Sequence, residues 1–105
     1  MNQYIVIFVT AKDKTQAKRI ARGLLKDRLV ACVNILGGVE SLFWWQGKID
    51  QGSEVLMIIK TKRKLFEKVN AKVKLLHSYQ TPEVIALPIK AGSWEYLKWV
   101  DTEVL

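Results

Sequence analysis

The sequence predicts an α+β fold in which two helices cover one face of a four-stranded antiparallel sheet. Two observations support this fold class. Apolar residues alternate between β-rich runs and helical spacing in the order β-α-β-β-α-β, followed by a short terminal helix, and the connections are short. This order is the split βαβ, or ferredoxin-like, pattern. The chain has 105 residues, half of them hydrophobic, which excludes intrinsic disorder. We therefore expect a single domain over residues 1–105.

The first strand and the first helix are both apparent near the start of the chain. Residues 4–9 are β-rich and apolar on both faces, as in a central strand. Asp13 is a candidate N-cap, and Gln16 follows it three residues later. Apolar residues at helical spacing then continue to about Asp27, with lysines and arginines on the opposite face. This pattern predicts an amphipathic helix packed on the sheet.

A long hairpin follows this helix. The next strand is expected over residues 29–35, and the glycine pair 37–38 predicts a bulge or bend in it. Residues 39–45 continue the ribbon, and residues 46–48 resemble a hairpin turn. The nearly apolar residues 54–60 form the returning strand.

The remaining elements have recognisable boundaries. Thr61 is a candidate cap for a second helix that ends near His77. Residues 83–87 are expected to form the last strand. Pro88 has no N–H to donate, so the end of this strand should lie at an edge of the sheet or the strand should terminate there. Ser93 caps a short final helix.

The hairpin is too long for an isolated domain of this size. A strand of about 16 residues spans about 50 Å, whereas the radius of gyration expected for the chain is about 13 Å. The far end of the ribbon carries four large apolar side chains, Leu42, Phe43, Trp44 and Trp45. A second copy of the chain would cover this patch and the open sheet edges. The alternative is a ribbon that folds back on its own sheet at the glycine pair; we favour the oligomer.

Composition and charge restrict the partners. The net charge of +7 permits an acidic partner, but the lysines and arginines are scattered among acids along the sequence. The aromatic strand of RNA-recognition modules is missing, so we expect no nucleic-acid partner. No apolar run approaches about 18 residues, and no signal peptide is visible, so we expect no membrane partner. A single cysteine favours the cytoplasm.

Few residues could carry metal chemistry or catalysis. Cys32 and His77 are the only soft or borderline ligands besides methionine, and copper(I) favours thiolate. Without a metal, Cys32 would be a small buried apolar residue, and His77 would be a residue at a helix C-terminus, solvated or bonded to a carbonyl. Two ligands are too few for a closed site, so carboxylates or another subunit would complete it. Lys60 precedes the helix expected at Thr61 and could contact an anion there, or extend to solvent from a strand end. Nothing marks a Cys-His nucleophile or a phosphate loop, so we expect no enzyme.

Four segments resemble those of one family, the CutA divalent-cation-tolerance proteins. Residues 28–35, RLVACVNI, are similar to the signature second strand of that family, and residues 41–48, SLFWWQGK, are similar to its aromatic hairpin. Glu54 with Lys60 and Thr61 matches its third strand, and residues 77–89 match the entry to its fourth. Ser78 departs from the pattern, since many members have proline there.

The resemblance implies more than the residues show by themselves. It implies a homotrimer similar in shape to PII signalling proteins, a cytoplasmic location, a link to copper and other divalent cations, and a cleft between subunits as the candidate site. Family positions in or near this cleft, or on the hairpin beside it, are matched by Cys32, Lys60, His77, Tyr79, Glu83 and Trp45.

These expectations combine into one hypothesis with two alternatives. We expect a non-enzymatic homotrimer that binds copper or another divalent metal ion at clefts between subunits. Cys32 and His77 would be the ligands, and Glu83 would add a carboxylate or orient the histidine. The alternatives are a PII-like sensor of a small anionic ligand, held in the cleft by Lys60 and Tyr79, and a purely structural trimeric module.

Overall fold

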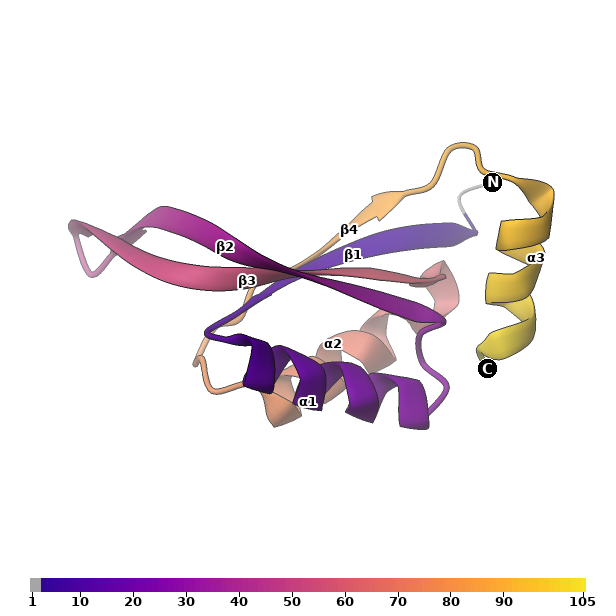
Figure 1. Cartoon of the computed structure of the whole chain (residues 1–105), viewed down its shortest axis with the longest axis horizontal. Helices are drawn as coiled ribbons and strands as arrows, with labels where there is room; N and C mark the ends of the chain where they lie inside the picture. Colours follow the sequence, from indigo (N-terminus) through magenta and orange to yellow (C-terminus); the bar gives the residue numbers. More distant parts are fainter. Residues whose placement is uncertain (1–2) are drawn as a thin grey trace.

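The computed structural model describes residues 3–105 and has the expected α+β architecture (Figure 1). Helices α1 and α2 lie on the same face of a four-stranded sheet, and α3 lies at one end of it. The strand order is β2-β3-β1-β4, and each neighbouring pair is antiparallel. The elements are β1 (Tyr4–Ala11), α1 (Lys14–Lys26), β2 (Cys32–Trp45), β3 (Lys48–Lys62), a 3₁₀ turn η1 (Arg63–Leu65), α2 (Phe66–Leu76), β4 (Val84–Pro88) and α3 (Trp94–Glu103).

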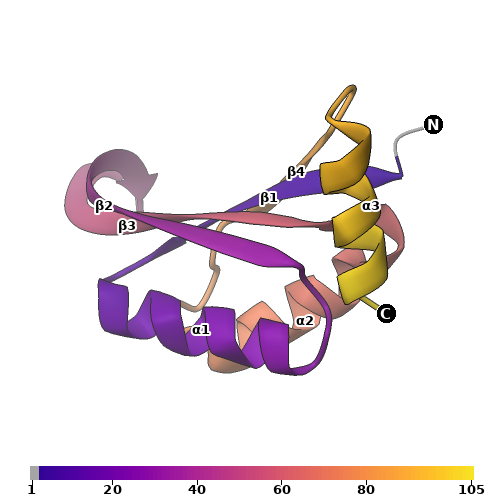
Figure 2. The same ribbon diagram turned by 45° about the vertical axis from the view of Figure 1, so that its right-hand side comes forward.

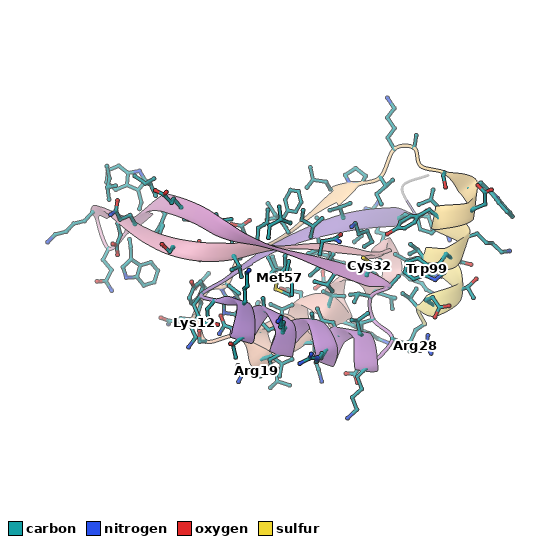
Figure 3. All side chains as sticks on the ribbon, viewed as in Figure 1. Lys12, Arg19, Arg28, Cys32, Met57 and Trp99 are labelled. Carbon is teal, nitrogen blue, oxygen red and sulfur yellow. The ribbon has the colours of Figure 1, made fainter. Side chains whose placement is uncertain are left out.

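The core lies between the sheet and the two helices. Side chains of β1 alternate, so that Ile5, Ile7 and Val9 are buried while their neighbours are only partly covered. Met57 of β3 lies between the sheet and α1 (Figure 3). Leu24 of α1 is fully buried. The apolar faces that the sequence periodicities predict for the strands and for the helices therefore pack against each other in one core.

Two predicted helix caps are confirmed. The Asp13 carboxylate accepts a hydrogen bond of 2.8 Å from the backbone N–H of Gln16 at the start of α1. The Ser93 hydroxyl accepts one of 3.1 Å from the N–H of Tyr96 at the start of α3. Both bonds span three residues, so they depend only on local sequence.

The predicted cap at Thr61 is wrong. Thr61 is a buried residue of β3, and its hydroxyl donates to the carbonyl of Leu29 at 2.6 Å. The strand therefore continues to Lys62, and α2 begins only at Phe66, after η1 and with no side-chain cap. No helix N-terminus therefore lies beside Lys60, because the chain there is still a strand, and this argument for an anion site at Lys60 does not hold.

The second strand begins later than expected but contains the expected bulge. Leu29 is buried in the connection, and β2 starts at Cys32. The register between β2 and β3 shifts between Leu36 and Val39. Gly38 lies inside this shift with a φ of 76°, a left-handed conformation that glycine adopts without a Cβ clash. The glycine pair thus forms a bulge within one continuous strand.

The hairpin projects from the body of the molecule. The ribbon of β2 and β3 extends beyond both helices and coils at its far end (Figures 1 and 2). Leu42 and Trp44 are 70% and 71% exposed, so the ribbon does not fold back on its own sheet. Gln46 and Gly47 both have positive φ at the turn, as a two-residue hairpin loop requires. Within residues 3–105, no helix is both long enough and apolar enough to cross a membrane.

Candidate functional site at the two ends of the sheet

His77 is held in place by both nitrogens of its ring. It follows α2 directly, and its Nδ1 accepts a hydrogen bond of 3.0 Å from the backbone N–H of Tyr79. Because Nδ1 accepts, Nε2 carries the proton and donates to the carbonyl of Thr10, 2.8 Å away. The imidazole therefore links the loop after α2 to β1. A metal ion would have to displace one of these two bonds to bind the ring.

Tyr79 extends the same cluster towards β3. Its ring lies against that of His77, with centroids 4.5 Å apart. Its hydroxyl donates to the carboxylate of Glu54 at 2.8 Å. Burial, then the hydrogen bond and negative charge of Glu54, raise the pKa of Tyr79 to about 12. Tyr79 is therefore a neutral hydrogen-bond donor at physiological pH.

Helix α1 anchors the loop that carries these residues. The buried amide of Gln16 donates to the Ser78 hydroxyl at 2.7 Å and accepts from the N–H of Lys12 at 3.0 Å. Arg19 donates to the carbonyl of Leu76 at 2.6 Å. Ser78, the residue that departs from the family pattern, thus has a specific partner on α1.

A second cluster surrounds Cys32 at the opposite end of the four-stranded part of the sheet, away from the projecting hairpin. Cys32 is opposite Lys60 in the register of β2 and β3. Lys60 donates to the side-chain oxygen of Asn34, and the Cys32 sulfur lies 3.8 Å from the same oxygen. Burial raises the pKa of Tyr96 on α3, and the neighbouring Cys32 thiol contributes to this rise. Figure 3 shows Cys32 at the α3 end of the sheet, far from Lys12.

The residues expected to bind metal are therefore separated within one chain. In the sheet register, Cys32 pairs with Lys60 of β3, and Lys60 pairs with Val6 of β1. His77 instead contacts Thr10, four residues further along β1. Four residues along a strand correspond to about 13 Å. Among the described residues, no three His, Cys, Asp or Glu side chains are close enough together to hold a metal ion.

Glu83 and Trp45 have different positions. Glu83 is exposed and precedes Val84, which pairs with Val9, so it lies at the His77 end of the sheet. Trp45 is half-exposed at the tip of the hairpin, opposite Lys48. Of the six residues expected around a cleft, one chain brings together His77, Tyr79 and Glu83 at one end, and Cys32 and Lys60 at the other. Trp45 joins neither group.

Sequence reasoning did not give a role to several residues that organise these clusters. Asn34 interrupts the apolar run of residues 29–36 and Glu54 directly precedes the apolar run of residues 55–59, and these polar positions are a signal that could have found them. Thr10 contributes only its backbone carbonyl, which leaves no signal in the sequence. The sequence predicts a role for Gln16 only in the helix cap, whereas its side chain also donates to Ser78.

The fold and the two clusters define a class of protein. A ferredoxin-like domain with an extended β2–β3 hairpin and polar clusters at both ends of its sheet is a PII-like α+β protein. The model of one family, the CutA1 divalent ion tolerance proteins, matches residues 5–103. The chain belongs to this family.

Individual relatives agree with this assignment. The chloroplastic CutA 1 protein of Oryza sativa is 47% identical over 96 residues, which are 91% of this chain and 54% of the rice protein. The divalent-cation tolerance protein CutA of Archaeoglobus fulgidus is 46% identical over 98 residues, 93% of this chain and 95% of the relative. The chain thus spans about half the length of the plant relatives and nearly all of the archaeal one.

Solved structures match over almost the whole chain. CutA1 from Oryza sativa superposes with a TM-score of 0.95 at 42% identity, covering 100% of this chain and 98% of that one. Cut A1 from Thermus thermophilus superposes with a TM-score of 0.94 at 40% identity, covering 96% and 98%. The compartments given for relatives differ: the plant proteins are chloroplastic, and the Archaeoglobus structure is described as periplasmic.

Proposed function

We propose that this chain forms a homotrimer that contributes to tolerance of divalent cations, copper in particular, by binding metal ions at clefts between subunits. We further propose that it has no catalytic role and acts in the cytoplasm. The family membership supports the link to cations. The separation of Cys32 from His77 argues against a Cys-His nucleophile within one chain. The unpaired Cys32 thiol suits a reducing compartment.

Uncovered apolar surface is the observation that carries the proposal. Helices cover only one face of the sheet, and Ile85 and Leu87 of the edge strand β4 are about half-exposed. The hairpin adds Leu42 and Trp44, which are more exposed still. Isolated soluble proteins rarely leave a patch of this kind or an open sheet edge unprotected. Copies of the chain around a closed axis would cover both, and the number three follows from the resemblance to the family.

Assembly would also complete a metal site that one chain lacks. A neighbouring subunit that placed its Cys32 end against the His77 end of the first would bring a thiolate close to an imidazole and to the carboxylate of Glu83. Cys32 and Glu83 are the readier ligands, because His77 already uses both ring nitrogens. A thiolate together with nitrogen and oxygen donors suits copper.

Light scattering tests the assembly with a matched pair of variants. Leu42→Ser removes an apolar side chain from the hairpin, and Leu75→Ser removes one of similar exposure, 75%, from α2. We expect the native protein and Leu75→Ser to have the mass of a trimer in dilute solution, and Leu42→Ser to dissociate on dilution. A native mass of 12.1 kDa would refute the proposed assembly.

Calorimetric titration with copper(I) under reducing conditions tests the ligands. We expect Cys32→Ser to lose most of the affinity and Glu83→Gln to lose part of it. Glu95→Gln, which removes an exposed carboxylate from α3, is the matched control and should bind as the native protein does. Binding should weaken at acidic pH, because the thiol must lose its proton to bind the metal. Equal affinity for all four proteins would exclude these ligands.

A further inference from the structure

The positive charge of the chain is concentrated in its helical layer. Elements α1, η1 and α2 comprise 27 residues and contain ten lysines and arginines against one acid, Glu67. Their net charge is +9, whereas the whole chain carries +7, so the rest of the molecule is slightly acidic at −2. Basic residues that are spread among acids along the whole sequence are therefore gathered by the fold into one layer.

The fold turns this charge outward. The two helices lie side by side on one face of the sheet (Figures 1 and 2). Most of their apolar side chains are buried in the core or pack against it. Nine of the ten basic residues are exposed, and Arg19 extends from α1 away from the sheet in Figure 3. Among the described residues, only Lys72 of this set has a carboxylate partner, Asp27 at 3.0 Å. The layer is thus a basic surface with little internal neutralisation.

Exposed apolar groups interrupt the basic surface at one end. Leu75 is 75% exposed and Leu105 is 57% exposed. Together with Leu29 and Ala71 they line a shallow groove of about 420 Å³, whose charged lining residues are Lys68, Lys72 and Asp27, the partner of Lys72. A partner of this face therefore has to bind positively charged side chains and also cover exposed leucine side chains.

We propose that the helical face formed by α1, η1 and α2 docks on the surface of an anionic lipid membrane. Lipid headgroups attract lysine and arginine by about 1 kcal/mol for each residue near the surface. Exposed leucines gain free energy by entering the boundary between headgroups and acyl chains. The mode of contact is peripheral, since no helix among residues 3–105 is long and apolar enough to cross a membrane. The proposal therefore departs from the expectation of no membrane partner, which considered spanning and secretion segments and not contact with a membrane surface.

A nucleic acid fits the same face less well. Binding of single strands uses exposed aromatic rings as stacking platforms, and Phe66, the only aromatic residue in these elements, packs partly against the core. A phosphate backbone would match the lysines but would leave the groove of Leu75 and Leu105 without an apolar partner. The proposed face is opposite the open side of the sheet, so the inference does not depend on the trimer.

Vesicle flotation at about 0.1 M salt tests the proposal. Native protein should float with vesicles of equal parts phosphatidylglycerol and phosphatidylcholine, and should not float with phosphatidylcholine alone or at about 1 M salt. Lys68→Gln combined with Lys74→Gln removes two charges from the face and should weaken binding about thirtyfold, or about fivefold for each lysine. Lys48→Gln combined with Lys90→Gln removes two exposed charges elsewhere and should leave binding nearly unchanged.

A second variant tests the contribution of the exposed leucines. Leu75→Ser keeps every charge and should weaken vesicle binding about tenfold, because one leucine no longer leaves water. Circular dichroism would establish that each variant is folded. Equal binding to neutral vesicles, or an equal loss in both lysine pairs, would overturn the proposal. So would tighter binding to a fluorescent DNA duplex that Leu75→Ser leaves unchanged, which would identify the face as a nucleic-acid surface.

Discussion

The hydrogen bond between Thr61 and Leu29 should contribute measurably to stability. The Thr61 hydroxyl is fully buried and donates to the Leu29 carbonyl at 2.6 Å, across 32 residues of sequence. Thr61→Val keeps the shape of the side chain but removes the donor, so the carbonyl is left buried without a partner. Loss of one partner of a buried hydrogen bond costs about 1–3 kcal/mol. We expect a loss of about 2 kcal/mol in the free energy of unfolding.

The chain offers a matched control on α3. Thr102 donates its hydroxyl to the Lys98 carbonyl at 2.9 Å, but this bond is exposed to solvent. Water can replace the hydroxyl there, so Thr102→Val should change the free energy of unfolding by less than about 0.5 kcal/mol. The two variants make the same chemical change and differ in burial.

Urea denaturation followed by circular dichroism measures both effects. Protein concentration must be the same in every sample, because an oligomer has a concentration-dependent stability. With a slope of about 1–2 kcal/mol per molar urea, Thr61→Val should lower the midpoint by about 1–2 M. Similar midpoints for both variants would refute the reasoning that burial of this bond stabilises the connection into β2.

Three further predictions concern the loop after α2. The pKa of Tyr79 is raised to about 12, so its contribution to stability is complete below pH 10 and is lost as the pH rises towards 12. In unfolding curves measured at alkaline pH, the Tyr79→Phe variant should therefore lose less stability with rising pH than the native protein. In spectrophotometric titration, Glu54→Gln should lower the pKa of Tyr79 only part of the way to 10, since burial is the larger cause; an unchanged value would contradict the assigned partner. Ser78→Ala leaves the Gln16 amide without its partner, so we expect the free energy of unfolding to fall by about 1 kcal/mol and the backbone amide of Tyr79 to exchange faster. Exchange at the native rate would show that Gln16 does not hold the loop.

Sequence reasoning succeeded where a contact is local and failed where it is distant. The caps at Asp13 and Ser93 join residues three apart, and both were predicted. Threonine is a residue type that often caps helices, but the Thr61 hydroxyl donates to a carbonyl 32 residues away, and the chain there stays in a strand. The same limit applies to His77, whose ring is bound by a backbone carbonyl 67 residues earlier. A backbone acceptor has no residue type, so the sequence contains no trace of it.

The sequence by itself determined the order of the strands and helices, the faces they bury and the bulge at the glycine pair, because periodicity and backbone conformation act over a few residues. It also held the residues that resemble the CutA family, from which membership follows. Only the tertiary structure decided that Cys32 and His77 lie at opposite ends of the sheet, because strand register sets that distance. It also gathered the lysines and arginines of two helices into one surface, because both helices bury their apolar sides on the same face of the sheet.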